Sequence, residues 1–180
     1  AHRRALGRRR GATLFMAVLA GLCLDFMKEL REDSPQLLQL IQSLPAFTLD
    51  PHWRESKLLP QLVQLFSSPT ATTQLRFHLL KAAAPASSSA ESLRLLARAQ
   101  GDPFGPIRLE AFEQLCAVLP LLKADVQVKV AGPAVCKALS DNQPELRVAA
   151  LRALGDDSRW LGGWIGGGRE LAERVGPVLL

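Results

Sequence analysis

The sequence predicts an all-α protein, a short α-solenoid (superhelix) built of stacked antiparallel helix pairs. Three observations support this fold class. The composition is 48% hydrophobic with only 6% aromatic residues and no Tyr, which suits helices better than a β-sandwich or barrel. Leu and Val recur at helical spacing along the chain. A phrase that joins a polar turn to an arginine-containing helix occurs more than once.

The repeated phrase is clearest in "SDNQPELRVAALRALG", residues 140–155, and in "GDPFGPIRLEAFEQLCAVLP", which begins at Gly101. Their alignment matches Asp102 with Asp141, Arg108 with Arg147, Ala111 with Ala150 and Leu115 with Leu154. A fainter copy, "SSPTATTQLRFHLLKAA", contains Arg76, and the three arginines stand 32 and 39 residues apart. A period near 40 is typical of stacked helical units, none of which buries its apolar face alone.

Each copy is preceded by a segment that predicts a partner helix. These segments are residues 56–66, 88–100 and 124–140. The repeating unit is therefore helix, turn, helix. Further upstream, Ser34 suits an N-cap and Pro35 the first helical position, so residues 13–44 are expected to form another helix pair.

These residues resemble the HEAT-type repeats of the armadillo-like α-solenoid superfamily. The best match, "LSDNQPELRVAALRALG", has Asp in the turn, Pro before the second helix, a Val/Leu-Arg pair and a closing Ala-Leu-Gly; "GDPFGPIRLEAFEQL" is the second. The resemblance covers residues 56–155, and residues 13–55 are expected to be weaker N-terminal helices of the same solenoid. It implies stacked helix pairs that act as a protein-binding scaffold.

Four polar residues are predicted to hold structural repeat positions. We expect Asp102 and Asp141 to accept backbone N–H groups at the start of the following helix. We expect Arg108 and Arg147 to reach a turn carboxylate of the neighbouring unit, because stacking brings like positions together. The core is expected to include Leu115, Leu139, Leu151 and Leu154.

The chain shows no recognisable catalytic or cofactor motif. There is no G-x-G-x-x-G and no Walker loop, and the histidines have no partner in a catalytic pattern. The cysteines are too few and too scattered for a disulfide framework or a metal site. We therefore expect no enzyme, no catalytic residue, no cofactor, no metal and no small-molecule substrate; the residues weighed are His2, His52, His78, Cys23, Cys116 and Cys136.

The net charge of +5 comes from the first ten residues. They contain five arginines and no acid, which leaves 17 basic and 17 acidic residues in the rest of the chain; the arginines are Arg3, Arg4, Arg8, Arg9 and Arg10. Residues 1–12 are predicted to be a flexible basic arm, most simply a solvated tail. Nucleic-acid or transport-linked binding through these arginines is the alternative function, disfavoured because the body of the chain is neutral.

The arm continues into "GATLFMAVLAGLCL", so that residues 1–24 have the basic and apolar parts of a signal peptide. However, Leu22 precedes Cys23 where a small residue is needed, and the apolar pattern continues to Leu30. An amphipathic helix is the preferred interpretation, and the apolar run is too short to span a membrane. The protein is expected to be intracellular, in the cytoplasm and/or nucleus.

Residues 156–180 differ from the rest of the chain. Five glycines fall within seven residues, and Trp160 and Trp164 appear without a helical pattern. This Gly-rich tail is expected to be disordered and dispensable, with a binding peptide as the alternative. The predicted function is a non-enzymatic protein–protein interaction scaffold, a fragment or isoform of a larger solenoid, whose partner is a protein.

Overall fold

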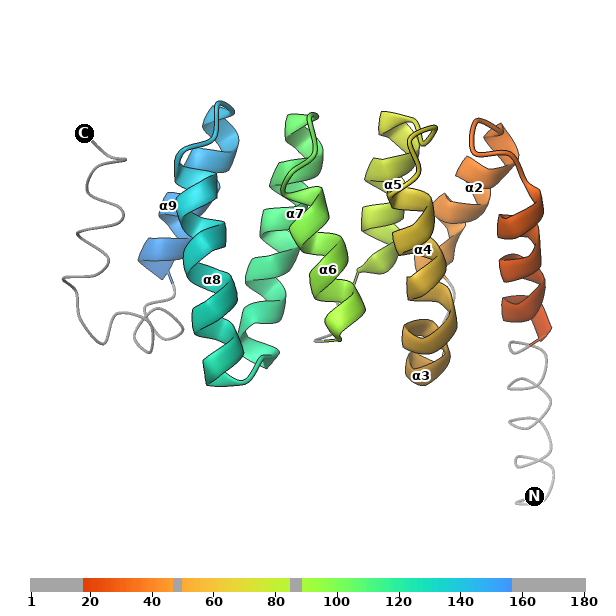
Figure 1. The fold of residues 1–180 in the computed structure, drawn as a ribbon, viewed down its shortest axis with the longest axis horizontal. Coiled ribbons are helices and arrows are strands. Elements are labelled where there is room, and N and C mark those ends of the chain that lie inside the picture. Colours follow the sequence, from red (N-terminus) through yellow and green to blue (C-terminus); the bar gives the residue numbers. More distant parts are fainter. Residues whose placement is uncertain (1–17, 47–49, 85–88, 157–180) are drawn as a thin grey trace, which may run out of the picture. The chain divides into compact units, whose positions relative to one another are not determined.

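The computed structural model describes residues 18–46, 50–84 and 89–156, and every regular element in these ranges is a helix (Figure 1). This confirms the predicted all-α class for the described part of the chain. The basic arm of residues 1–12 and nearly all of the Gly-rich tail lie outside the described residues. The chain divides into two compact units, Ala1–Ala83 and Ala84–Leu180, here called unit 1 and unit 2.

Unit 1 begins with a helix that is described from residue 18 to residue 29, followed by α2 (Pro35–Ser43) and a 3-10 turn, η1 (Leu44–Ala46). The start of α2 agrees with the sequence. The Ser34 hydroxyl accepts the N–H of Leu37 at 3.2 Å, and Pro35 takes the first helical position. Leu37 and Ile41 are fully buried, and α2 packs on α5.

The next helix is longer than expected. It runs without a break through α3 (Pro51–Trp53), the π-helical η2 (Arg54–Leu58) and α4 (Leu59–Phe66). It begins at Pro51 rather than at Ser56, because the Asp50 carboxylate accepts the N–H of Trp53 at 2.9 Å and caps the helix there. The division expected between residues 55 and 56 therefore lies inside a helix.

The last helix of unit 1, α5 (Thr73–Ala83), packs on both α2 and α4. It starts beside Thr72, whose hydroxyl accepts the N–H of Leu75 at 3.1 Å. At its other end the Ala82 carbonyl accepts a hydrogen bond from Arg54 Nη2 at 2.7 Å. This bond ties the start of the α3–α4 helix to the end of α5.

Unit 2 consists of two helix pairs joined by short turns. The first pair is α6 (Ala90–Ala99) and α7 (Gly105–Val118); the second is α8 (Ala124–Leu139) and α9 (Pro144–Asp156). A 3-10 turn, η3 (Leu119–Leu121), connects the pairs. The two helices of each pair pack on each other, and α7 also packs on α9. In Figure 1, α6 and α8 lie in front of α7 and α9.

The core of unit 2 agrees with the predicted register except in α9. Leu115 and Leu139 are 2% and 4% exposed, as expected, and the aligned Ala111 and Ala150 are both fully buried. Leu154 is half-buried. The prediction that Leu151 is a core residue is wrong, because its side chain is 46% exposed.

The exposure of Leu151 follows from its place in the second pair. Phe112 holds the equivalent position, four residues after the repeated arginine, and is only 2% exposed. It is covered by the next pair, since Ala138 and Leu146 line the same small cavity. Among the described residues, no element covers the corresponding side of α9, where Val148 is also exposed.

Phe112 and Leu151, which hold equivalent positions in the two helix pairs, allow a direct test of this register. Phe112→Ala should lower the free energy of unfolding by about 3–5 kcal/mol, because it opens a cavity between the two helix pairs. Leu151→Ala should lower it by less than about 1 kcal/mol, because the side chain is already half in water. Urea unfolding of the two variants measures the difference, and equal losses would contradict the register.

Candidate functional site

The two turns of unit 2 carry the predicted repeat positions. Asp102 is 7% exposed, and its Oδ1 accepts the N–H of Phe104 at 2.9 Å. Asp141 Oδ1 accepts the N–H of Gln143 at 2.9 Å in the same way. Both acids therefore fold their own turn. The bonded amides belong to Phe104 and Gln143, which directly precede α7 and α9, so each acid accepts a backbone N–H group at the start of the following helix.

The three arginines of the repeated phrase use the same atom in the same way. Arg76, Arg108 and Arg147 each donate from Nη1 to the carbonyl five residues earlier, at 2.6, 3.0 and 3.2 Å respectively. In unit 2 the same atom also reaches the carbonyl of the turn acid, at 2.8 Å from Arg108 and 2.9 Å from Arg147. Each arginine thus satisfies carbonyls of the turn that precedes its own helix.

Arg108 also joins the two helix pairs. Its Nε and Nη2 donate to the two carboxylate oxygens of Asp141 at 2.8 and 2.7 Å, and Nη2 donates to Asn142 Oδ1 at 2.8 Å. With the two bonds to the carbonyls of Asp102 and Pro103, all five guanidinium N–H donors have an acceptor. The predicted bridge to the acid of the neighbouring turn is therefore present at Arg108.

This ion pair is largely shielded from water. The side chains of Arg108 and Asp141 are 12% and 9% exposed. The hydrogen bonds from Arg108 lower the pKa of Asp141 against the opposing effect of burial, and the bond to Asp141 raises the pKa of Arg108. Because the folded-state pKa of Asp141 is lowered, its stabilising effect is complete above the unfolded value of about 3.9 and is lost as the pH falls below it.

Arg147 lacks the second half of this arrangement within the described residues. It binds the carbonyls of its own turn, but no described carboxylate lies within 4.0 Å of its guanidinium. Since α9 is the last helix described, the bridge expected from Arg147 to a neighbouring turn is not seen. Arg108 and Arg147 therefore differ in burial, and their replacement should lower the free energy of unfolding by different amounts.

Gly105 and Gln143 form a second contact between the two turns. A side chain at Gly105 would collide with the amide end of Gln143. The glycine at the start of α7 therefore leaves room for the end of the Gln143 side chain. This is a structural use of the glycine in "GDPFGP" and needs no phosphate ligand.

Unit 1 contains a turn-to-turn link that the sequence analysis missed. Glu32, in the turn before α2, accepts a hydrogen bond from Ser68 Oγ at 2.6 Å and another from Thr70 Oγ1. Ser68 and Thr70 lie in the turn between α4 and α5. The link joins successive turns, as the Arg108 bridge does, but it uses an acid and two hydroxyls and so leaves no repeated pattern to find.

The remaining side chains offer little chemistry. Burial, with a smaller effect of Glu113, raises the pKa of Cys116 to about 11, so its thiol is protonated at neutral pH and is a poor nucleophile. The described residues contain no cluster of three His, Cys, Asp or Glu that could hold a metal ion. The space beside the Arg108–Asp141 pair is about 10 Å³, roughly the room that one water needs. This arrangement joins the helix pairs and leaves little free space beside the ion pair.

The five arginines proposed as anionic contacts lie outside the described residues; they are Arg3, Arg4, Arg8, Arg9 and Arg10. None of the helices in the described ranges is long and apolar enough to cross a membrane.

No protein-family model, curated protein or solved structure matches this chain.

The difference between the two arginines gives a prediction. Arg108→Met should lower the free energy of unfolding by about 3 kcal/mol, because it leaves Asp141 charged and buried without its partner. Arg147→Met should lower it by only about 1 kcal/mol, because it removes exposed bonds to carbonyls. Urea unfolding at neutral pH measures both. A larger loss for Arg147→Met than for Arg108→Met would show that the bridge is not the stronger link.

Proposed function

We propose that the chain is part of a HEAT-like α-solenoid that acts as a scaffold for a protein partner and has no catalytic activity. The bond that each repeated arginine makes to the carbonyl five residues earlier carries this proposal. It supports a repeated helix–turn–helix unit, as the resemblance to HEAT-type repeats implies. Stacked units of this kind present extended surfaces made of successive helices, and they use these surfaces to bind proteins.

Arg108 and Asp141, the ion pair of the repeated turns, are already committed to structure. Arg108 has no free donor, and Asp141 has its carboxylate filled by Arg108 and the Gln143 amide. A partner must therefore contact the exposed faces of the helices. The three cysteines are unpaired, which favours a reducing compartment such as the cytoplasm or nucleus.

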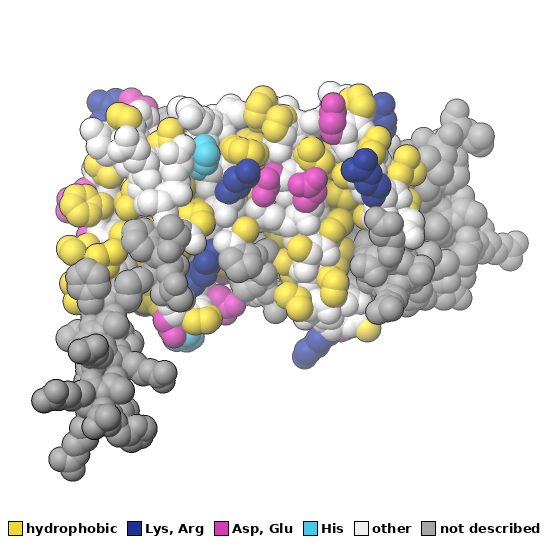
Figure 2. All heavy atoms as spheres, turned by 180° about the vertical axis from the view of Figure 1, so that it is seen from behind, with side chains coloured by type: hydrophobic (Ala, Val, Ile, Leu, Met, Phe, Trp, Pro, Cys, Tyr) yellow, Lys and Arg dark blue, Asp and Glu magenta, His cyan; other side chains and the backbone are white. Residues whose placement is uncertain are grey.

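Nucleic-acid binding through the arginine arm is the alternative. A phosphate-binding surface normally shows a basic excess over the folded domain. Figure 2 shows acidic and basic side chains close together on the side of unit 2 where α7 and α9 lie. The described part of this face therefore favours a protein partner over a nucleic acid.

The test is affinity capture from cell extract with the full chain, with and without nuclease. The control is a variant in which Arg3, Arg4, Arg8, Arg9 and Arg10 are replaced by Gln. We expect a defined protein to be retained by both chains after nuclease treatment, with a weak dependence on salt. Retention of nucleic acid alone, lost in the arginine variant and falling steeply with salt, would replace the scaffold with the alternative.

A further inference from the structure

An apolar groove lies between the first helices of the two pairs in unit 2. Its volume is about 270 Å³, and it is lined mainly by apolar side chains of α6, α7 and α8: Leu93, Ala97, Leu115, Val130, Pro133 and Ala134. We call it the α6–α8 groove. Pockets that take drug-sized ligands are typically about 300–1,000 Å³. The groove therefore suits a few side chains of a partner better than a whole small molecule.

The groove exists because small residues stand where the two helices face each other. The second helices, α7 and α9, pack together, and each first helix packs on its own second helix. Ala97 on α6, with Pro133 and Ala134 on α8, provides no long side chain to fill the space between the first helices. Leu115 of α7, 2% exposed, forms the floor.

Two lysines of α8 stand at the edge of the groove. Lys129 and Lys137 are eight residues apart, which is about 12 Å along a helix. No described carboxylate lies within 4.0 Å of either ammonium group. Lys137 adds to the effect of Arg108 in lowering the pKa of Asp141, but that carboxylate is already bound by Arg108. Val130, Pro133 and Ala134 lie between the lysines along α8, so an apolar stretch is flanked by two positive charges.

The two groove helices are basic within a body of balanced charge. Together α6 and α8 contain four basic and two acidic residues, whereas the chain after residue 10 contains 17 of each sign. Glu91 and Arg94 pair with each other at 2.5 Å, which leaves three basic residues and one acidic residue on the two helices. The charge complementary to this surface is therefore negative.

We propose that the α6–α8 groove binds an acidic amphipathic helix of a partner protein. Apolar side chains of this helix enter the groove, and carboxylates about two turns apart meet Lys129 and Lys137. The matching pattern is an acid at positions i and i+7 with apolar residues at i+3 and i+4, which lie on one helix face. This inference rests on the proposed function and adds the site and the chemistry of the partner.

A nucleic acid matches the groove less well. Single strands bind along continuous basic tracks with aromatic side chains on which the bases stack. The residues that line the groove include two lysines and no aromatic side chain. An oligonucleotide therefore serves as the competing probe in the test.

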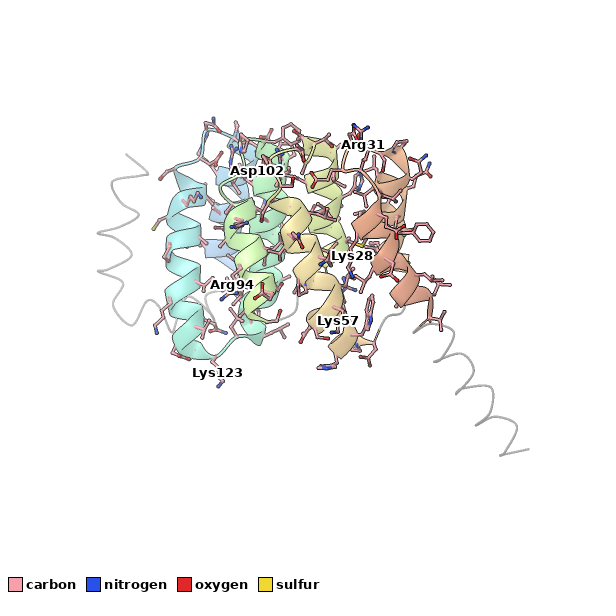
Figure 3. The ribbon with its side chains drawn as sticks, turned by 45° about the vertical axis from the view of Figure 1, so that its right-hand side comes forward. Lys28, Arg31, Lys57, Arg94, Asp102 and Lys123 are labelled. Carbon is pink, nitrogen blue, oxygen red and sulfur yellow. The ribbon has the colours of Figure 1, made fainter. Side chains whose placement is uncertain are left out.

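The test is a fluorescence anisotropy titration of the full chain with a labelled helical peptide that has Glu at i and i+7 and Leu at i+3 and i+4. We expect saturable binding, weakened roughly tenfold by Glu→Gln in the peptide and by Lys129→Glu or Lys137→Glu in the protein. Ala97→Trp, which fills the groove, should abolish it. Lys123→Glu is the matched control and should change the affinity less than twofold. Figure 3 shows Lys123 at the opposite end of unit 2 from Asp102, and Lys123 does not line the groove.

Absence of peptide binding overturns the inference, as does binding that Lys129→Glu and Ala97→Trp leave unchanged. Binding of a labelled single-stranded oligonucleotide that is lost in the same two variants also overturns it. Thermal unfolding of each variant shows whether the fold is kept. If these variants still capture the protein partner from cell extract, the α6–α8 groove is not the binding site and the proposed scaffold function stands. If the full chain captures no protein, the proposed function itself fails.

Discussion

The guanidinium of Arg108, which is largely shielded from water, fixes the two turns of unit 2 against each other. A charge that is largely shielded from water is stable when its donors are paired, since removal of the partner of a buried charge costs several kcal/mol. All five donors are paired here, two within one turn and three with the next. The two turns must therefore keep one relative position, which in turn places α7 against α9 and covers Phe112.

The packing of α7 on α9 also determines the space that is left between α6 and α8. When the turns fix α7 on α9, the first helices take their places from their own partners and do not need to touch each other. Small residues at Ala97 and Ala134 then leave the space between α6 and α8 open. Arg108 and Asp141 are used in joining the two turns, so the proposed partner would contact apolar surface and the lysines of α8. In the proposed binding mode, Lys129 and Ala97 contact the partner and take no part in the Arg108 bridge.

Local signals predicted much of this arrangement. Ser34 and Pro35 marked the start of α2, and the repeated Asp and Arg marked the Arg108 bridge, because these depend on short-range geometry and on the repeat itself. The exposure of Leu151 could not be predicted, since it depends on a neighbour and not on the helix that carries it. The Glu32 link of unit 1 was missed because its chemistry is not repeated. The α3–α4 helix starts at Pro51, and this start could have been predicted, because Asp50 suits an N-cap and Pro51 the first helical position.

A double-mutant cycle on Arg108 and Asp141 tests the central claim, that this bond holds consecutive helix pairs together. The free energy of unfolding is measured for the native chain, Arg108→Met, Asp141→Asn and the double variant. A coupling energy of about 2 kcal/mol is predicted, as for groups that share one buried network. Additive losses, within about 0.5 kcal/mol, would show that the two side chains act independently, and would contradict the claim that they hold the pairs together.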